Sequence, residues 1–490
     1  MDCSTKSFLA VLPYVAVACS LSACAASLGP GYIVERQQIQ VAFLPQPEPV
    51  IHVIAEYHLK NTGNQQLDFL KVRLPGRRFS RGPVAISVDG ALQPQTPSPD
   101  NPRDTLIKFL SPWPIGAGHS IQFTYDIPSA SAAEVSLVFS ADAFDLPAEG
   151  WTPSLPQAPG LFGFGGIPPK KWELLVRVPQ GFLVHASGGE EKHSRQGERM
   201  ELRFEQTADD LNPFIVAGRY RETRQGLADN QQVHIWSRTE PDPRSLEQAG
   251  ESLSKTLRAY DALFGARGKS RPPLWIVECP AESGCIAQRA TSYSSLLYGS
   301  QQETSAEMIS RDTVMIDSRI AAGEREALAG PALAAGWLGY GRNPGFYEQQ
   351  PPMSALPVFA AALAREQSSG TQVGTEIIQR ALAQIPSHAS PQSNNEPAVA
   401  RAKSLLFFYA LRDRVGSGNF QKAIEHMLEA RRQRGFDISD LISALEQESH
   451  QEIGPFVRNW IKRPGVPEDF RTRYSKPVAR QDSRNQEAMP

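Results

Sequence analysis

Two cysteines in the body of the chain, Cys279 and Cys285, could form a covalent cross-link or bind a metal ion. They enclose the short sequence Pro-Ala-Glu-Ser-Gly, and a loop of this size can close as a disulfide in an oxidising compartment. Two thiolates without a neighbouring histidine supply only half of a tetrahedral zinc shell, and cysteine catalysis would need a histidine that the fold brings close. We therefore expect a Cys279–Cys285 disulfide, with metal binding as the alternative.

A third cysteine, Cys24, ends the sequence Leu-Ser-Ala-Cys near the N-terminus. This sequence follows Lys6 and an apolar run over residues 8–17, which is too short to span a bilayer comfortably and is typical of a secretory signal peptide. It resembles the bacterial lipobox, in which the signal is removed and the cysteine takes the lipid. We expect residues 1–23 to be a lipoprotein-type signal peptide and Cys24 to be acylated; ordinary cleavage near Ala26 is the alternative.

The composition limits the kinds of partner. The chain has 50 basic and 52 acidic residues, so it lacks the broad positive field of a nucleic-acid binder, and we expect no nucleic-acid partner. The lipid on Cys24 would attach the protein to a membrane, and the following Ala25 is not a residue that would retain it at the inner membrane. We expect an exported protein of the cell envelope, an outer-membrane lipoprotein that faces the periplasm.

Other residues that could do chemistry give weaker signals. The serines within residues 292–295 lack the Gly-x-Ser-x-Gly turn of a serine hydrolase, and His234 alternates within a strand pattern that is typical of a structural role. A group of acids and their neighbours could form an acid/base pair, although charged residues beside a helix usually form its solvated face. This group consists of Glu324, Glu326, Tyr340, Arg342, Tyr347 and Glu348.

The elements that must position such residues divide the chain into parts. A chain of 490 residues is too long for one hydrophobic core, so two or three domains are expected. From Tyr32 to about Tyr220, short runs with alternating polar and apolar residues are separated by turn residues, which is the pattern of an antiparallel β-sandwich. We assign residues 24–225 to this domain. Its clearest strand patterns cover residues 38–43, 50–54, 120–125 and 172–178.

After Pro241 the apolar period lengthens to three or four residues, which predicts a helix that ends at Gly265. Two strand patterns and two long helical stretches follow, as in a small α/β unit that closes into helices. The strands are predicted at residues 274–277 and 313–316, and the helical stretches at 328–365 and 398–461. We assign residues 226–385 to the α/β domain, 398–470 to a C-terminal helical segment and 471–490 to a disordered tail.

This order of β-sandwich, α/β unit and helical segment resembles the aminopeptidase N family of gluzincin zinc metallopeptidases. The stretch Lys-Ser-Leu-Leu from Lys403 resembles that family's helix pair after the active site. Gly-Pro-Phe-Val-Arg-Asn-Trp-Ile from Gly454 and Pro-Gly-Val-Pro from Pro464 resemble its closing segment. The resemblance implies a multidomain α+β fold in which an antiparallel sandwich precedes a thermolysin-like α/β unit and a helical C-terminal segment.

In that family, His-Glu-x-x-His on one helix and a Glu nineteen residues later hold the zinc, because positions i and i+4 share one helix face. Here the corresponding helix reads Pro-Ala-Leu-Ala-Ala-Gly-Trp-Leu-Gly. Proline and alanine replace the two histidines at Pro331 and Ala335, and Ala332 replaces the glutamate. The third ligand position falls on Ser354, and the position of the family's oxyanion-stabilising tyrosine falls on Arg401.

The histidines give an independent argument, because none lies between residues 235 and 387 and no His-Glu-x-x-His occurs anywhere. Serine, alanine and proline cannot replace a pair of imidazoles, so we expect no zinc, no other cofactor and no gluzincin chemistry. The sequence favours a degenerate member of the family, a catalytically inactive scaffold that binds a peptide or an envelope protein. An active aminopeptidase-type hydrolase with a non-standard site and a structural subunit of an envelope complex are the alternatives.

Overall fold

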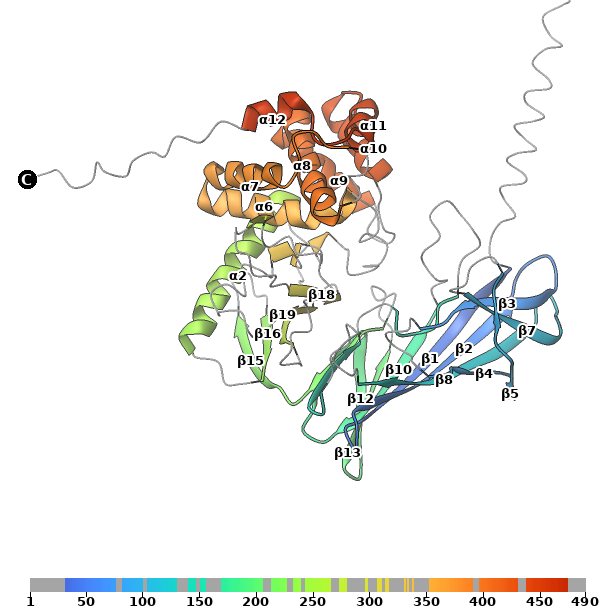
Figure 1. Ribbon diagram of the computed structural model, residues 1–490. Helices are drawn as coiled ribbons and strands as arrows, with labels where there is room; N and C mark the ends of the chain where they lie inside the picture. The colour runs from blue at the N-terminus through green and yellow to red at the C-terminus, as the bar shows by residue number, and fades with distance from the viewer. Residues whose placement is uncertain are drawn as a thin grey trace, which may run out of the picture. The chain divides into compact units, whose positions relative to one another are not determined.

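The chain forms two compact units, which we describe separately (Figure 1). The first comprises Met1–Pro128, Gly150–Gln180 and Gly188–Leu211, and the second comprises Ser129–Glu149, Gly181–Ser187 and Asn212–Pro490. This division differs from the predicted boundary at residue 225, because three earlier segments join the second unit. The computed structural model describes residues 31–75, 82–99, 104–129, 140–146, 150–155, 169–205, 213–226, 232–238, 243–265, 273–279, 296–297, 306–310, 313–316, 330–331, 333–334, 337–338, 352–390, 396–430 and 438–474.

The first unit contains an eight-stranded sheet. In spatial order, its strands are β12 (Gly189–Gln196), β13 (Arg199–Glu205), β10 (Trp172–Pro179), β1 (Tyr32–Leu44), β2 (Val50–Asn61), β8 (Gly118–Pro128), β4 (Ala85–Val88) and β5 (Ala91–Leu92). Buried and partly exposed residues alternate along β2, as the sequence pattern predicts. One pairing differs from the predicted antiparallel sandwich, because β1 and β10 run parallel, with Gln38 opposite Glu173.

A smaller sheet in the same unit consists of β3 (Leu67–Arg73), β7 (Asp104–Trp113) and β6 (Thr96–Pro97). Two buried tyrosines of the large sheet, Tyr57 and Tyr125, donate hydrogen bonds to the backbone carbonyls of Pro153 and Trp151. A phenol buried in an apolar core needs such an acceptor, so these bonds hold the segment around Trp151 against the apolar face of the sheet.

The second unit contains two sheets of its own. A three-stranded sheet has the order β11 (Leu183–Ala186), β14 (Ile215–Gly218) and β9 (Ala143–Leu146). A five-stranded sheet has the order β15 (Arg221–Gly226), β16 (Gln232–Ser237), β17 (Leu274–Glu278), β19 (Thr313–Ile316) and β18 (Ala306–Ser310). Its three central strands, β16, β17 and β19, are parallel, and the strands predicted at residues 274–277 and 313–316 are confirmed.

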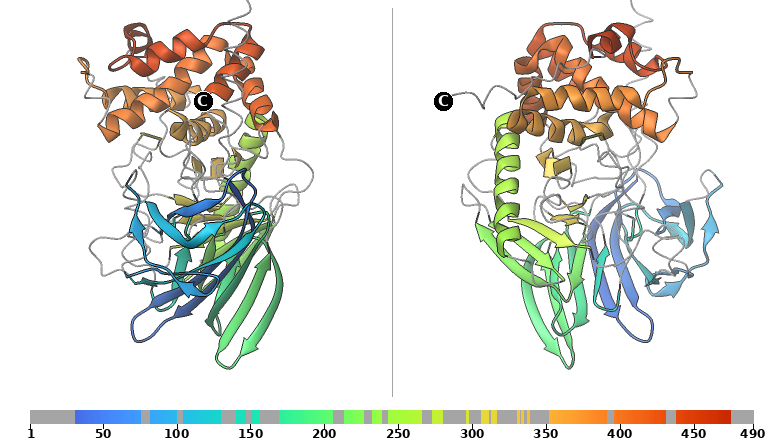
Figure 2. Two further views of the ribbon diagram at one scale, coloured as in Figure 1. Left: turned by 90° about the vertical axis from the view of Figure 1, so that its right-hand side faces the viewer. Right: turned by 60° about the vertical axis from the view of Figure 1, so that its left-hand side comes forward.

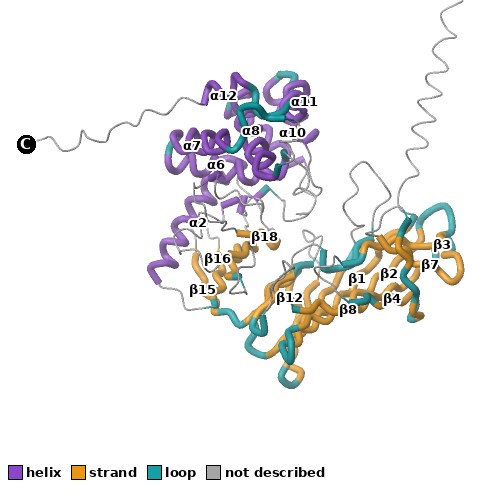
Figure 3. Tube along the Cα trace, in the orientation of Figure 1, coloured by secondary structure: helices purple, strands orange, loops and turns teal. Residues whose placement is uncertain are grey.

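Helices follow these strands in the described part of the second unit (Figures 2 and 3). They are α2 (Pro243–Phe264), η3 (Met353–Ala355), α6 (Leu356–Ser369), α7 (Thr371–Ala383), α8 (Pro397–Val415), α9 (Ser417–Ala430), α10 (Ile438–Ser449), α11 (Gly454–Lys462) and α12 (Glu468–Tyr474). The predicted end of α2 is confirmed, because Gly265 follows it with a φ of 78°. The tail prediction is wrong for residues 471–474, which continue α12 because the buried Phe470 anchors that helix.

The hydrophobic core of the second unit joins the apolar side of α2, the central strands and the C-terminal helices. Two helices lie inside it: residues 356–364 of α6 are all buried, and so are residues 405–411 of α8. A helix that is apolar on every side must be surrounded by protein or by lipid. None of the helices in the described part of the chain is long and apolar enough to cross a membrane.

Candidate functional site

The predicted zinc position is partly described. Pro331 lies in a helical piece and is partly exposed, and Ser354 lies in η3 with a partly exposed side chain. The neighbours of Ser354 in the sequence, Met353 and Ala355, are buried. Ala332 and Ala335 lie outside the described residues, so these two positions stay predictions. Neither described position carries an imidazole or a carboxylate.

The described residues next to Pro331 and Ser354 in the sequence are mostly apolar. Buried residues near these positions belong to one hydrophobic cluster: Leu333, Ala334, Trp337, Leu338, Met353, Ala355 and Leu356. Tyr260 of α2 donates a hydrogen bond of 2.7 Å to the backbone carbonyl of Gly330, and its ring lies 6.1 Å from that of Trp337. These contacts hold the segment that carries Pro331 against α2, where the family would place its first zinc ligand.

These residues do not fit zinc. Proline has no side-chain donor, and the hydroxyl of Ser354 is a poor ligand for an ion that prefers thiolate, imidazole and carboxylate. Within the described ranges, no group of three or more His, Cys, Asp and Glu side chains could hold a metal ion. The donor set at Pro331 and Ser354 therefore supports no metal-dependent step.

The position of the family's tyrosine, Arg401, lies on α8 and is partly exposed. Two residues later, Lys403 is buried, and its ammonium group donates to the backbone carbonyls of Ile461, at 3.4 Å, and Arg463. Burial lowers the pKa of Lys403. This lysine ties α8 to the end of α11, which is a structural role.

A partly buried ion pair links α6 to α8. Arg412 donates two hydrogen bonds to the carboxylate of Glu366, at 2.8 and 3.4 Å, and each side chain is 16% exposed. The guanidinium group also lies 5.0 Å from the centre of the Tyr409 ring. Burial would lower the pKa of Arg412, but its hydrogen bonds and charge interaction with Glu366 raise it. Residues 46 positions apart form this pair, and no local sequence pattern signals it.

A second polar group lies among the strands. The ring of Trp275 on β17 is stacked between two imidazoles, His185 of β11 and His234 of β16, with both centroid distances 4.0 Å. His234 Nδ1 lies 2.7 Å from Glu222 Oε1, and His185 Nε2 lies 2.9 Å from Thr313 Oγ1. Burial lowers the pKa of His185 to about 3, and the charge of His234 acts in the same direction. The indole between the rings keeps them from sharing a ligand.

Most of the other candidate residues from the sequence lie outside the described residues. The acids and neighbours between Glu324 and Glu348 lie outside the described residues, as do the serines within residues 292–295. Cys279 is fully buried and disulfide-bonded. Cys285 and Cys24 lie outside the described residues, so the Cys279–Cys285 pairing and the lipidation stay predictions.

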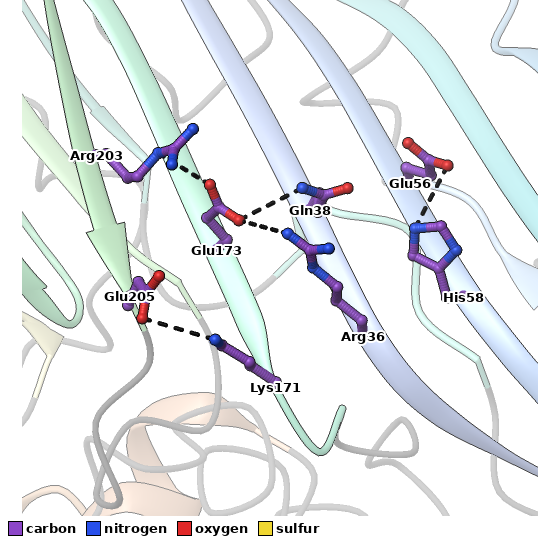
Figure 4. Close-up of polar contacts among 8 residues, drawn as sticks. All are labelled: Arg36, Gln38, Glu56, His58, Lys171, Glu173, Arg203 and Glu205. Atoms are coloured by element: carbon purple, nitrogen blue, oxygen red, sulfur yellow. Dashed lines mark hydrogen bonds and ion pairs between the residues drawn. The ribbon is translucent and has the colours of Figure 1, made fainter.

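A row of charges crosses the polar face of the eight-stranded sheet in the first unit (Figure 4). Glu173 on β10 accepts a hydrogen bond of 2.8 Å from Arg36 and makes an ion pair of 2.9 Å with Arg203. Lys171 pairs with Glu205 at 3.7 Å. Burial would raise the pKa of Glu173, but the hydrogen bond from Arg36 and the charge of Arg203 outweigh it and lower that pKa.

The chain resembles known proteins through its fold. No protein-family model matches the chain, and no curated protein matches it. The M1 zinc metallopeptidase of Deinococcus radiodurans is 16% identical, with a TM-score of 0.59 over 92% of this chain and 98% of that chain. A mutant of that enzyme gives a TM-score of 0.60 over 90% of this chain and 96% of the mutant, also at 16% identity.

A two-domain M1 zinc metallopeptidase mutant bound to L-tryptophan is also 16% identical, with a TM-score of 0.58 over 90% of this chain and 96% of that one. At this identity the likeness establishes the fold. The chain is a multidomain α+β protein with large β-sheets and a helical C-terminal segment, similar to the M1 peptidases of the aminopeptidase N family. The resemblance seen in the sequence is confirmed to that extent.

Proposed function

We propose that this protein is an exported, lipid-anchored scaffold of the cell envelope, with the fold of a metallopeptidase but without its chemistry. In this proposal Cys24 carries the lipid, and a surface of the peptidase-like fold binds a peptide or an envelope protein. The protein faces the periplasm from the outer membrane.

The observation that carries the proposal is the donor set at the inherited zinc position. Pro331 and Ser354 supply no strong zinc ligand, and the described residues around them are apolar. Zinc lowers the pKa of bound water only when three protein ligands leave a coordination position open. A fold can persist through its core packing while its site is lost, because fold does not determine function.

The test measures metal content and hydrolysis in one preparation. The chain from Ala25 onward is incubated with zinc, separated from free metal, and analysed by plasma mass spectrometry. The same sample is assayed on aminoacyl p-nitroanilides with and without a chelator. We expect substoichiometric zinc and no chelator-sensitive hydrolysis. Stoichiometric zinc or chelator-sensitive cleavage would replace the proposal with an active peptidase that has a non-standard site.

A restored variant serves as the matched control. Pro331→His, Ala332→Glu, Ala335→His and Ser354→Glu together recreate the family's ligand spacing on the same fold. We expect this variant to retain zinc in the assay that shows none for the parent chain, because two imidazoles and a carboxylate complete the protein ligand set. If both proteins retain equal zinc, other donors hold the metal and the proposal is wrong.

A further inference from the structure

Three exposed large apolar side chains lie on β3, on β7 and in the turn that follows β7. Leu110 on β7 is 88% exposed, Phe69 on β3 is 52% exposed, and Ile115 in the turn after β7 is 59% exposed. Phe69 lies opposite Lys108 in the pairing of β3 with β7, so Phe69, Lys108 and Leu110 share the outer face of this sheet. We call Phe69, Leu110 and Ile115 the N-terminal apolar patch.

The described chain begins beside this patch. The carbonyl of Gly31 accepts hydrogen bonds from the backbone N–H groups of Thr62 and Gly63, at 3.0 and 2.8 Å. A methyl group added to Gly31 would meet the side chain of Leu67, which begins β3, at 3.6 Å. The next residue, Tyr32, pairs with Asn61, whose carbonyl accepts a 2.8 Å hydrogen bond from Gly116 in the turn that carries Ile115.

Chain length limits how far this end can lie from the lipid. Seven peptide steps separate Cys24 from Gly31, and even a fully extended chain spans only about 25 Å over that length. An acylated Cys24 would therefore keep Gly31, and the patch beside it, within that distance of the bilayer surface. The two strands carry three basic and two acidic residues, and Arg73 and Asp104 among them pair with each other at 3.0 Å. Lys71 and Lys108 against Asp68 then leave a net charge of one positive unit, which suits anionic headgroups.

We propose that the N-terminal apolar patch docks on the lipid surface, with Leu110 and Ile115 inserted at the boundary between headgroups and acyl chains. This inference rests on the proposed lipidation of Cys24, because that lipid would bring the patch to the bilayer. One acyl signal gives marginal membrane binding by itself, so a second contact adds to it. The docking also fixes which end of the first unit faces the membrane.

The test uses the chain from Ala25 onward, which carries no lipid and keeps every described residue. Co-sedimentation with sucrose-loaded vesicles of phosphatidylethanolamine and phosphatidylglycerol measures its partition coefficient. The combined variant Leu110→Ser and Ile115→Ser should lower that coefficient about tenfold, since each aliphatic side chain loses part of its transfer free energy. Both residues are exposed, so melting curves should match those of the parent chain; Phe69→Ser is a second, independent variant.

Leu92→Ser and Ile461→Ser are the matched controls, because they remove exposed aliphatic side chains outside the patch, on β5 and α11. We expect both to bind vesicles as the parent chain does. Absence of vesicle binding by the parent chain, or an equal loss in the controls, overturns the proposal. Cross-linking in cells from a photoreactive amino acid in place of Leu110 to a protein instead of lipid also overturns it. Acylation of Cys24 is tested separately, because a chain that is not acylated incorporates no labelled palmitate.

Discussion

Two regions of the second unit hold buried polar groups in different ways. Between α6 and α8, Glu366 and Arg412 are both charged and bind each other through two hydrogen bonds. Among the strands, His185 and His234 cover the two faces of Trp275 and direct ring nitrogens to Thr313 and Glu222. The first arrangement depends on charge, and the second depends on ring stacking around the indole of Trp275, with His185 in its neutral form.

The difference shows why retained polar residues need not form a site. In the helical region the charges neutralise each other, and the two neighbours in sequence of Ser354, the predicted third ligand position, belong to the apolar core. In the strand region two imidazoles are present, but an indole separates them and each has a partner. In both regions these residues stabilise the fold, and neither arrangement brings free donors together at one point.

The largest expected effect comes from breaking the charged arrangement. Arg412→Met should lower the free energy of unfolding by about 3 kcal/mol, because it leaves the carboxylate of Glu366 largely shielded from water and unpaired. Urea unfolding followed by circular dichroism measures the loss. Replacing both residues, Glu366→Met with Arg412→Met, should recover most of it, since paired charges can be exchanged for apolar contacts. If the single variant is as stable as the double variant, the pair does not carry the stability assigned to it.

Removing the ring at the centre of the stack should cost less. Trp275→Ala should lower the free energy of unfolding by about 2 to 3 kcal/mol, since a partly buried indole and two stacking contacts are lost. Trp275→Phe keeps an aromatic ring between the imidazoles and should recover part of the loss. Equal stability of the Ala and Phe variants in the same urea titration would show that the stacking contributes nothing.

The neutral state of His185 makes a pH prediction. The unfolded chain takes up a proton on this residue below about pH 6.5, whereas the native pKa of about 3 keeps the folded ring neutral. Stability should therefore fall as the pH is lowered from about 6.5 towards 3. Between pH 6.5 and 5, His185 should account for about 1 to 2 kcal/mol of that fall. His185→Gln should remove this share, and parallel pH profiles for the variant and the parent chain would contradict the prediction.

The sequence predicts local elements well because their signals are periodic. The alternation in β1, β2, β8 and β10 and the helical period that ends at Gly265 are both confirmed. The parallel pairing of β1 with β10 and the Glu366–Arg412 pair were not predictable, since they join segments that are distant in the sequence and leave no local pattern. At the candidate site, ligand spacing predicted Pro331 and Ser354, and only the fold shows that their described neighbours in sequence belong to one apolar core.

The smallest expected effect lies in the first unit and extends the comparison to a carboxylate whose arginine partners are exposed. Glu173 binds Arg36 and Arg203, each of which is nearly half exposed, so Glu173→Gln should lower the free energy of unfolding by about 1 kcal/mol. The net effect of its surroundings is to lower the pKa of Glu173. The ionised carboxylate therefore stabilises the folded state at neutral pH, and this stabilisation is lost as the pH falls through the native pKa. The difference in the free energy of unfolding between Glu173→Gln and the parent chain should therefore vanish on acidification and shrink with added salt. Urea unfolding at several pH values and salt concentrations measures it.

The stability loss in Arg412→Met should depend less on salt, because that pair is more shielded from solvent. Equal salt dependence of the two losses would mean that burial does not separate the two kinds of ion pair.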